Sequence, residues 1–123
     1  MPEFSFGKQY RLRSSGDFEY LKTDCKQLST KFVKAYFKPT KENEIHSRIG
    51  ISVSKKVGKA KTRNIFKREI RETFRVSKLR ERGLDLLFVV SPRLTKYFPS
   101  DRQAKLEFKK SLYGLLQKVQ QSI

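Results

Sequence analysis

The chain has 123 residues, with 29 Lys and Arg against 12 Asp and Glu, for a formal net charge of +17. Its 37% hydrophobic content, including ten Phe and five Tyr, exceeds that of a disordered basic tail and suits one folded domain. No apolar run reaches the roughly 18 residues of a membrane span, no signal-peptide core begins the chain, and Cys25 cannot form an internal disulfide. We therefore expect one domain over residues 1–123 in a reducing, cytoplasmic compartment.

The N-terminal third is predicted to contain a basic arm and one helix. Residues 1–14 have no clear period and form the arm. From about Ser15 the apolar positions Phe18, Leu21, Cys25 and Leu28 step by three and four residues, which is typical of a short amphipathic helix.

Two strands are expected next. Residues 30–38 alternate, with Val33 and Phe37 on one side and Phe32, Lys34 and Tyr36 on the other. A second strand runs through Ile49, Ile51 and Val53, and its other face carries only Gly50 and Ser52.

Gly58 separates the second strand from a long helix predicted over residues 60–82. At about 100° per residue, one stripe is apolar and the flank beside it is basic, whereas Glu69 and Glu72 fall on the far side. The stripe consists of Phe66, Ile70, Thr73 and Phe74, and the flank consists of Asn64, Lys67, Arg71, Arg75 and Lys78.

The C-terminal part predicts a buried strand and a final helix. Gly83 is a cap signal, and residues 84–90 are continuously apolar up to Ser91-Pro92. Ser100-Asp-Arg-Gln103 has capping-box spacing before an amphipathic helix. The predicted order is helix, strand, strand, helix, strand, helix.

The central charge pattern indicates a polyanionic partner. From Arg48 to Arg80, twelve basic residues face two acids, Glu69 and Glu72. Such one-sided charge destabilises the folded chain, because the cations repel one another. Binding to phosphates neutralises them, so nucleic acid is the favoured partner. A solvated helix face is the alternative, but such faces normally mix charge signs to form ion pairs.

Cations at i, i+4 and i+8 lie roughly 6 Å apart along a helix flank, which suits successive backbone phosphates. Arg63, Arg68 and Arg71 are the strongest candidates because Arg can bind phosphate bidentately. Lys55, Lys56 and Lys67 would act as point charges, and Asn64 could bond a phosphate, a 2′-hydroxyl or a base edge.

The first strand offers a second candidate surface. Phe32 and Tyr36 share a predicted face with Lys34, and rings among cations suit stacking on unpaired bases. Burial of both rings beneath the first helix explains the pattern equally well.

No constellation in the sequence predicts catalysis or metal binding by the chain itself. His46 is the only histidine and lies in a polar segment, and the acids are scattered. The chain has no Walker loop, CxxC or HExxH motif. We predict no catalytic residue and no metal ligand.

These residues resemble the bacterial ribonuclease P protein component. The resemblance rests on Gly50-Ile-Ser-Val-Ser-Lys-Lys-Val-Gly-Lys-Ala followed by Arg63-Asn64-x-x-Lys67-Arg68-x-x-Arg71-Glu72, with Arg11-Leu12-Arg13 and Asp17-Phe18 near the start. It covers most of residues 9–91. Lys22, Cys25 and Lys61 depart from residues common in that family.

The resemblance implies an α/β fold of the two-layer α+β sandwich kind, with a central mixed sheet and a left-handed βαβ crossover. It also implies a 1:1 partnership with a catalytic RNA that holds Mg²⁺ and removes the 5′ leader of precursor tRNA. By position, the contacts to the catalytic RNA would be Lys55, Lys56, Arg63, Asn64, Lys67, Arg68 and Arg71. The leader cleft would contain Phe18 and Tyr36, with Lys34, Arg11 and Arg13.

Two other functions fit the charge and size less specifically. A structural RNA-binding protein, such as a ribosomal protein, would not need this order of strand, Gly turn and Arg-Asn helix. A self-sufficient nuclease would need an acid and base pair that the sequence does not offer.

Overall fold

A four-stranded mixed sheet carries two long helices on one face in the computed structural model, which describes residues 12, 20–21, 23–40 and 45–123. The strands are β1 (Lys26–Ser29), β2 (Val33–Pro39), β3 (Arg48–Ser52) and β4 (Leu84–Val90), in the spatial order β1-β2-β4-β3. β2 pairs antiparallel with β1 and β4, whereas β3 pairs parallel with β4. The two-layer α+β class is therefore confirmed.

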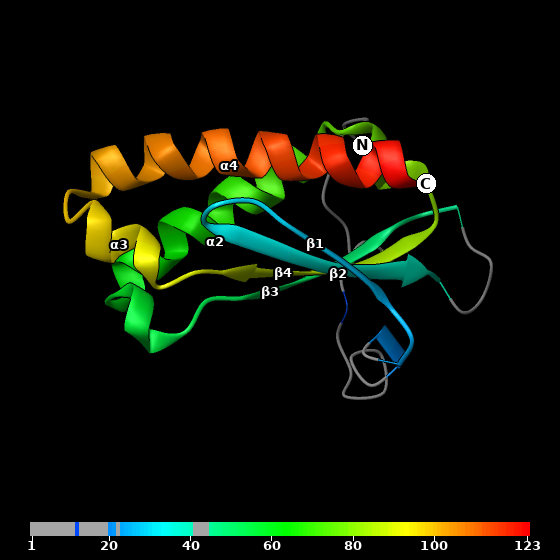
Figure 1. Cartoon of the computed structure of the whole chain (residues 1–123), viewed down its shortest axis with the longest axis horizontal. Helices are drawn as coiled ribbons and strands as arrows, with labels where there is room; N and C mark the ends of the chain where they lie inside the picture. Colours follow the sequence, from blue (N-terminus) through cyan, green and yellow to red (C-terminus); the bar gives the residue numbers. More distant parts are fainter. Residues whose placement is uncertain (1–11, 13–19, 22, 41–44) are drawn as a thin grey trace, which may run out of the picture.

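Between β3 and β4 the chain forms the 3₁₀ turn η2 (Lys55–Val57), the helix α2 (Ala60–Arg75) and the 3₁₀ turn η3 (Lys78–Glu81). The short helix α3 (Arg93–Tyr97) and the long helix α4 (Asp101–Ser122) follow β4. In Figure 1, α2 and α4 lie on the same side of the sheet. Because α2 connects two adjacent parallel strands, it is a crossover helix; the hand of this crossover stays a prediction.

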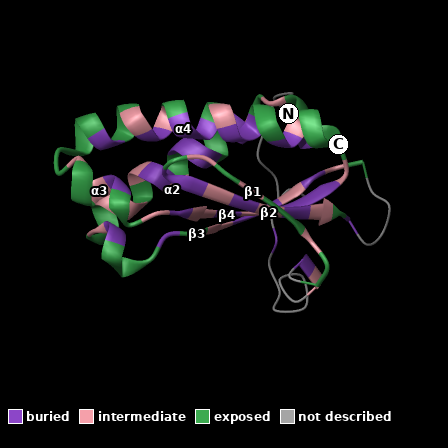
Figure 2. Cartoon of the chain, viewed as in Figure 1, coloured by how far each residue is buried: buried purple, intermediate pink, exposed green. Residues whose placement is uncertain are grey.

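The core lies between the sheet and these helices. Val33, Ala35 and Phe37 of β2 are buried opposite Val90, Phe88 and Leu86 of β4 in the antiparallel register. The predicted apolar stripe of α2 is buried as expected, and the buried positions of α4 are spaced along one face of the helix (Figure 2). Among the described residues, no helix combines the length and apolarity needed to cross a membrane.

The first helix does not extend as far as predicted. Tyr20 and Leu21 are helical, but Asp24 adopts a φ of 56°, which a short polar residue tolerates and which interrupts a helix. Residues 26–29 then form β1 and pair with β2, so Cys25 precedes a strand and Leu28 lies within it. The helix predicted from the three- and four-residue spacing is therefore wrong for residues 25–28. Phe18 lies outside the described residues.

The long helix ends at Arg75 rather than at residue 82. The Ser77 hydroxyl and backbone N–H both donate to the Phe74 carbonyl, at 2.9 and 3.0 Å, and the chain turns into η3. Lys78 therefore does not continue the basic flank of α2, and Gly83, with a φ of 65°, follows η3 instead of that helix. The helix α3 had no predicted counterpart.

The edge strand β3 is tied to β4 by a buried ion pair. The Arg48 Nε and Nη2 atoms donate to the two Asp85 carboxylate oxygens at 2.9 and 2.8 Å. The Asp85 side chain is fully buried and that of Arg48 is 19% exposed. Removing one partner of such a pair leaves an uncompensated buried charge, which is expensive.

We expect Asp85→Ala to lower the free energy of unfolding by about 3 kcal/mol, because Arg48 loses the carboxylate that neutralises it in a largely buried position. Urea denaturation measures the loss. The control is Glu107→Ala, which breaks a more exposed pair with Lys110 and should cost less than about 1 kcal/mol. Similar losses in both variants would contradict this account of the ion pair.

Candidate nucleic-acid interface

The turn before α2 presents two of the predicted cations to solvent. Lys55 and Lys56 of η2 are exposed, whereas Val57 is 2% exposed and its carbonyl accepts a hydrogen bond from Thr95 Oγ1 at 2.6 Å. Gly58 closes the turn with a φ of 154°, and a Cβ there would lie 3.1 Å from the Thr62 side chain. The buried anchor and the glycine together hold the two lysines at the start of α2.

The predicted cations of α2 do not all lie on one flank. Around the helix, Arg63 and Lys67 fall on one side, whereas Lys61, Arg68 and Arg71 line a hollow together with Glu69, which contacts α4. Asn64, Arg68 and Arg71 are exposed, and Arg63 and Lys67 are half-buried. The Arg63 Nε donates to the Gly58 carbonyl at 3.2 Å, so this side chain also braces the turn.

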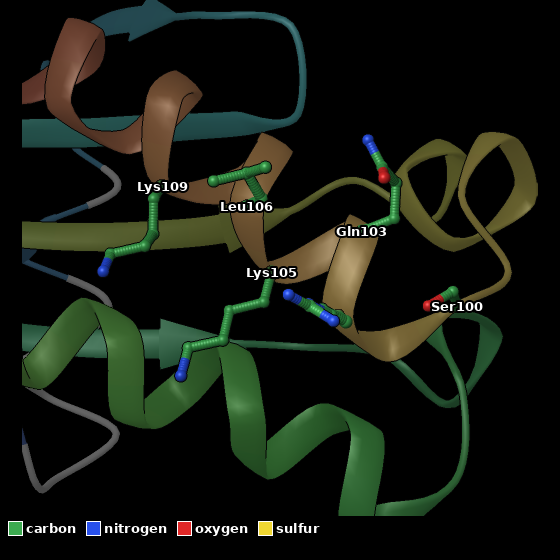
Figure 3. Close-up of a pocket in the computed structure, with 6 residues that line it drawn as sticks. Ser100, Gln103, Lys105, Leu106 and Lys109 are labelled. Carbon is green, nitrogen blue, oxygen red and sulfur yellow. The ribbon is translucent and has the colours of Figure 1, made fainter.

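The helix α4 contributes cations that the sequence reasoning missed. Lys105 and Lys109 extend from α4 toward α2 in Figure 3, and Lys109 Nζ lies 3.6 Å from Glu69 Oε1. Lys105 lines a hollow together with Arg68 and Arg71 of α2. The i, i+3, i+7 spacing of Arg102, Lys105 and Lys109 was a usable signal, because it places three cations on one side of the predicted last helix.

Hydrogen bonds at the β1–β2 turn fix the position of α4. The Ser111 hydroxyl accepts a hydrogen bond from the Phe32 N–H at 3.0 Å and lies 2.7 Å from the Thr30 hydroxyl oxygen. Ser111 is 8% exposed. The same helix packs its Phe108 ring against Phe66 of α2, with centroids 5.2 Å apart.

The sheet face opposite the helices holds the second predicted surface. Tyr36 stands opposite Leu87, and Lys34 stands opposite Val89, and all four side chains are half-buried. Gly50 and Ser52 of β3 continue these two rows across the sheet. The Lys34 Nζ lies 5.7 Å from the centroid of the Tyr36 ring. A row of small and apolar groups beside a cation can accommodate an extended strand.

Phe32 does not belong to this strip. It precedes β2, is 2% exposed, and packs edge-on against Phe98 with ring centroids 5.8 Å apart. Phe32 is therefore buried, although by Phe98 and not by the first helix. Tyr36 is half-buried on the face opposite α2 and α4, and the residues 15–19 predicted to cover it lie outside the described residues. The other predicted cleft residues, Arg11, Arg13 and Phe18, lie outside the described residues.

The described residues before β1 contact two strands of the sheet, β3 and the end of β2. The Leu12 N–H donates to the Ile49 carbonyl of the edge strand β3 at 2.9 Å, and Leu12 is 7% exposed. Lys38 Nζ lies 3.7 Å from the centroid of the Tyr20 ring, whose hydroxyl donates to the Pro39 carbonyl at 2.9 Å.

Most of the described acids, and His46, are engaged in ion pairs rather than gathered at a site. His46 Nδ1 lies 2.8 Å from Glu81 Oε2, and Asp85 is bound to Arg48. In the described part of the chain, the His, Cys, Asp and Glu side chains form no group of three or more that could hold a metal ion. What this geometry offers chemically is two surfaces for a polyanion, on opposite sides of the sheet.

We expect Ser111→Ala to lower the free energy of unfolding by about 1 to 2 kcal/mol, because the buried Phe32 N–H loses its acceptor. Thermal or urea denaturation measures this. Ser122→Ala is the control: its hydroxyl bonds within the last turn of α4, and its loss should stay below about 0.5 kcal/mol. Equal stability of the Ser111 variant and the unmodified chain would refute this anchoring of α4.

Comparisons with known proteins agree in sequence and in structure. The family model described as Ribonuclease P matches residues 6–119. The ribonuclease P protein component of Macrococcus caseolyticus is 39% identical over 105 residues, which is 85% of each chain. That of Staphylococcus carnosus is 37% identical over 109 residues, or 89% of each chain.

Solved structures give the same result. The RNase P protein of Staphylococcus aureus superposes with a TM-score of 0.74 at 31% identity, covering 89% of this chain and 94% of the other. The RNase P protein of Thermotoga maritima superposes with a TM-score of 0.72 at 31% identity, covering 88% and 96%.

Proposed function

The chain belongs to the ribonuclease P protein family, and from this membership we propose that it is the protein subunit of a tRNA-processing endoribonuclease. In this proposal it binds one catalytic RNA and the 5′ leader of precursor tRNA. The RNA, with Mg²⁺ bound to it, cleaves the leader. Precursor tRNA of a bacterium is in the cytoplasm, so the proposed activity belongs there.

The observation that carries the proposal is the division of the molecule into two surfaces. The first consists of Lys55 and Lys56 in the turn after β3 with the cations and Asn64 of α2, the helix that lies on the same side of the sheet as α4. The second is the sheet face opposite α2 and α4, around Tyr36 and Lys34. We assign the first surface to the catalytic RNA and the second to the leader.

The chemistry of each surface supports its assignment. The α2 surface is rich in Arg and Lys and presents no aromatic ring among its assigned residues, which favours backbone phosphates over base stacking. The strip on the sheet carries a half-buried ring beside a cation, which suits an unpaired strand whose bases can stack.

Mg²⁺ fits the RNA better than it fits the described part of this chain. Mg²⁺ prefers oxygen ligands, often one or two carboxylates, and the buried acids Asp85 and Glu69 are already paired with Arg48 and Lys109. The chain would contribute positive charge near crowded phosphates, and so reduce the number of counterions that the folded RNA requires. We assign it no catalytic residue.

We expect the chain to lower the Mg²⁺ concentration needed for cleavage. Precursor tRNA is incubated with the catalytic RNA of the same organism, with and without the purified chain, across a Mg²⁺ titration. The midpoint should fall severalfold when the chain is present, because its cations replace part of the Mg²⁺ atmosphere. An unchanged midpoint would refute the subunit function and favour a structural RNA-binding protein.

The two surfaces can be separated by a pair of variants. We expect Lys67→Gln to weaken assembly with the catalytic RNA and to reduce the slope of log K against log salt concentration by about 0.7 to 0.9. We expect Tyr36→Ala to weaken binding of precursor tRNA to the assembled enzyme by about fivefold or more, through loss of a stacked base.

Mature tRNA, which lacks the leader, is the matched control ligand for both variants. Tyr36→Ala should leave its affinity unchanged, and Lys67→Gln should affect mature and precursor tRNA alike once assembly is complete. If Tyr36→Ala weakened both ligands equally, the assignment of the sheet face to the leader would be wrong.

A further inference from the structure

A continuous groove runs between α2 and α4, on the side of α2 away from Arg63 and Lys67. Two adjoining hollows of about 490 and 400 Å³ lie between the helices, and the groove extends past Lys105 into a third hollow of about 660 Å³ that is lined by residues of the start of α4 alone. Lys105 lines all three, and Arg68 and Glu69 line two of them. Each hollow is large enough for a small ligand, so the row as a whole suits an extended one.

The groove is strongly basic. Its acids are Glu69, which pairs with Lys109, and Glu72, which pairs with Arg75, each at 3.6 Å. Its cations are Lys61, Arg68, Arg71, Arg75, Arg102, Lys105 and Lys109. Among the described residues, no carboxylate forms an ion pair with Arg68, Arg102 or Lys105, so these three remain available to an anionic ligand.

Exposed apolar groups accompany these cations. Tyr113 of α4 is 56% exposed and lines the hollow that also contains Arg68 and Lys109. Leu106 is 52% exposed and lines the hollow nearer the start of α4. An exposed ring beside phosphate-binding cations can stack on an unpaired base, and base stacking tolerates any sequence.

The composition of the groove favours RNA over a protein partner. Protein interfaces are depleted of Lys, whereas this groove is lined by three lysines and four arginines with only two acids. The groove also continues the proposed RNA-binding surface, because Asn64, Arg68 and Arg71 of that surface line one of the hollows. The sheet face assigned to the leader lies on the other side of the sheet.

We propose that the α2–α4 groove binds an unpaired stretch of the catalytic RNA, with Arg68, Lys105 and Arg102 on its phosphates and Tyr113 stacked on one of its bases. The identity of the ligand as RNA rests on the proposed function. The site itself adds α4 to the RNA-binding surface and gives that surface an aromatic contact that α2 lacks.

Assembly of the full-length chain with the catalytic RNA, measured by filter binding, tests this site. We expect Tyr113→Ala to weaken assembly by about fivefold or more, and Tyr113→Phe to retain the affinity because the ring remains. Lys105→Gln should weaken assembly and lower the salt slope by about 0.7 to 0.9. Lys110→Gln is the matched control: it lies on the same helix outside the groove and should bind as the unmodified chain does.

Crosslinking locates the contact. Catalytic RNA containing 4-thiouridine is assembled with the chain, irradiated, and the crosslinked peptides are identified by mass spectrometry. We expect crosslinks in the α4 peptide that contains Tyr113, reduced in Tyr113→Ala. Thermal denaturation should give unchanged midpoints for these variants because the altered side chains are exposed.

The proposed site would be wrong if Tyr113→Ala and Lys105→Gln both bound the catalytic RNA with unmodified affinity. It would also be wrong if the crosslinks were confined to α2 and the sheet. Neither result would affect the proposed function, which the Mg²⁺ titration and the Lys67→Gln variant test separately. If the chain failed to lower the Mg²⁺ requirement while the α4 crosslink persisted, the groove would stand as an RNA site and the subunit function would not.

Discussion

The arrangement of the proposed binding surface on α2 and α4 depends on one packing contact, between Phe66 of α2 and Phe108 of α4. Both rings are fully buried, and their centroids lie 5.2 Å apart at an interplanar angle of 62°. Such an edge-on aromatic pair contributes about 0.5 to 1.5 kcal/mol beyond its burial. By holding the two helices together over the sheet, it brings Arg68 and Arg75 of α2 beside Lys105 and Lys109 of α4.

Bringing those cations together costs electrostatic free energy, because like charges repel. Carboxylates offset this repulsion at some of the cations and not at others. Lys109 and Arg75 have carboxylate partners at 3.6 Å, and Arg48 is neutralised by the buried Asp85. The cations assigned to phosphate are left with fewer partners, so a polyanion would relieve the repulsion among them. Positive charge is therefore paired where it supports the sheet and concentrated where a partner would bind.

The sheet separates the two proposed ligands. The helices α2 and α4 cover one face and exclude water from Ala35, Phe37 and Phe88. The other face presents Tyr36 and Lys34 in the same strand, because successive side chains point to opposite sides. One strand thus supplies both the core and the strip that we assign to the leader.

Local signals in the sequence predicted an element correctly where the pattern of apolar residues is compatible with only one kind of secondary structure. The apolar run of residues 84–90, bounded by Gly83 and Ser91-Pro92, predicted β4 to the residue, and the stripe through Phe66 and Phe74 predicted the buried face of α2. The spacing through Cys25 and Leu28 misled, because a three- and four-residue step also fits a turn at Asp24 followed by a short edge strand. Pairing with β2, which is a tertiary contact, decided that segment.

The sequence by itself determined the charge, the cation spacing along α2, the Gly58 turn and the family resemblance, since all of these depend on residues close together in the chain. Only the tertiary structure decided that Phe32 is buried while Tyr36 lies on the face opposite α2 and α4, and that Arg68 turns toward α4 instead of joining Arg63 and Lys67. It also placed Lys105 and Tyr113 beside α2. These outcomes depend on which helix packs against which, and residues some forty positions apart carry no local pattern that specifies such a contact.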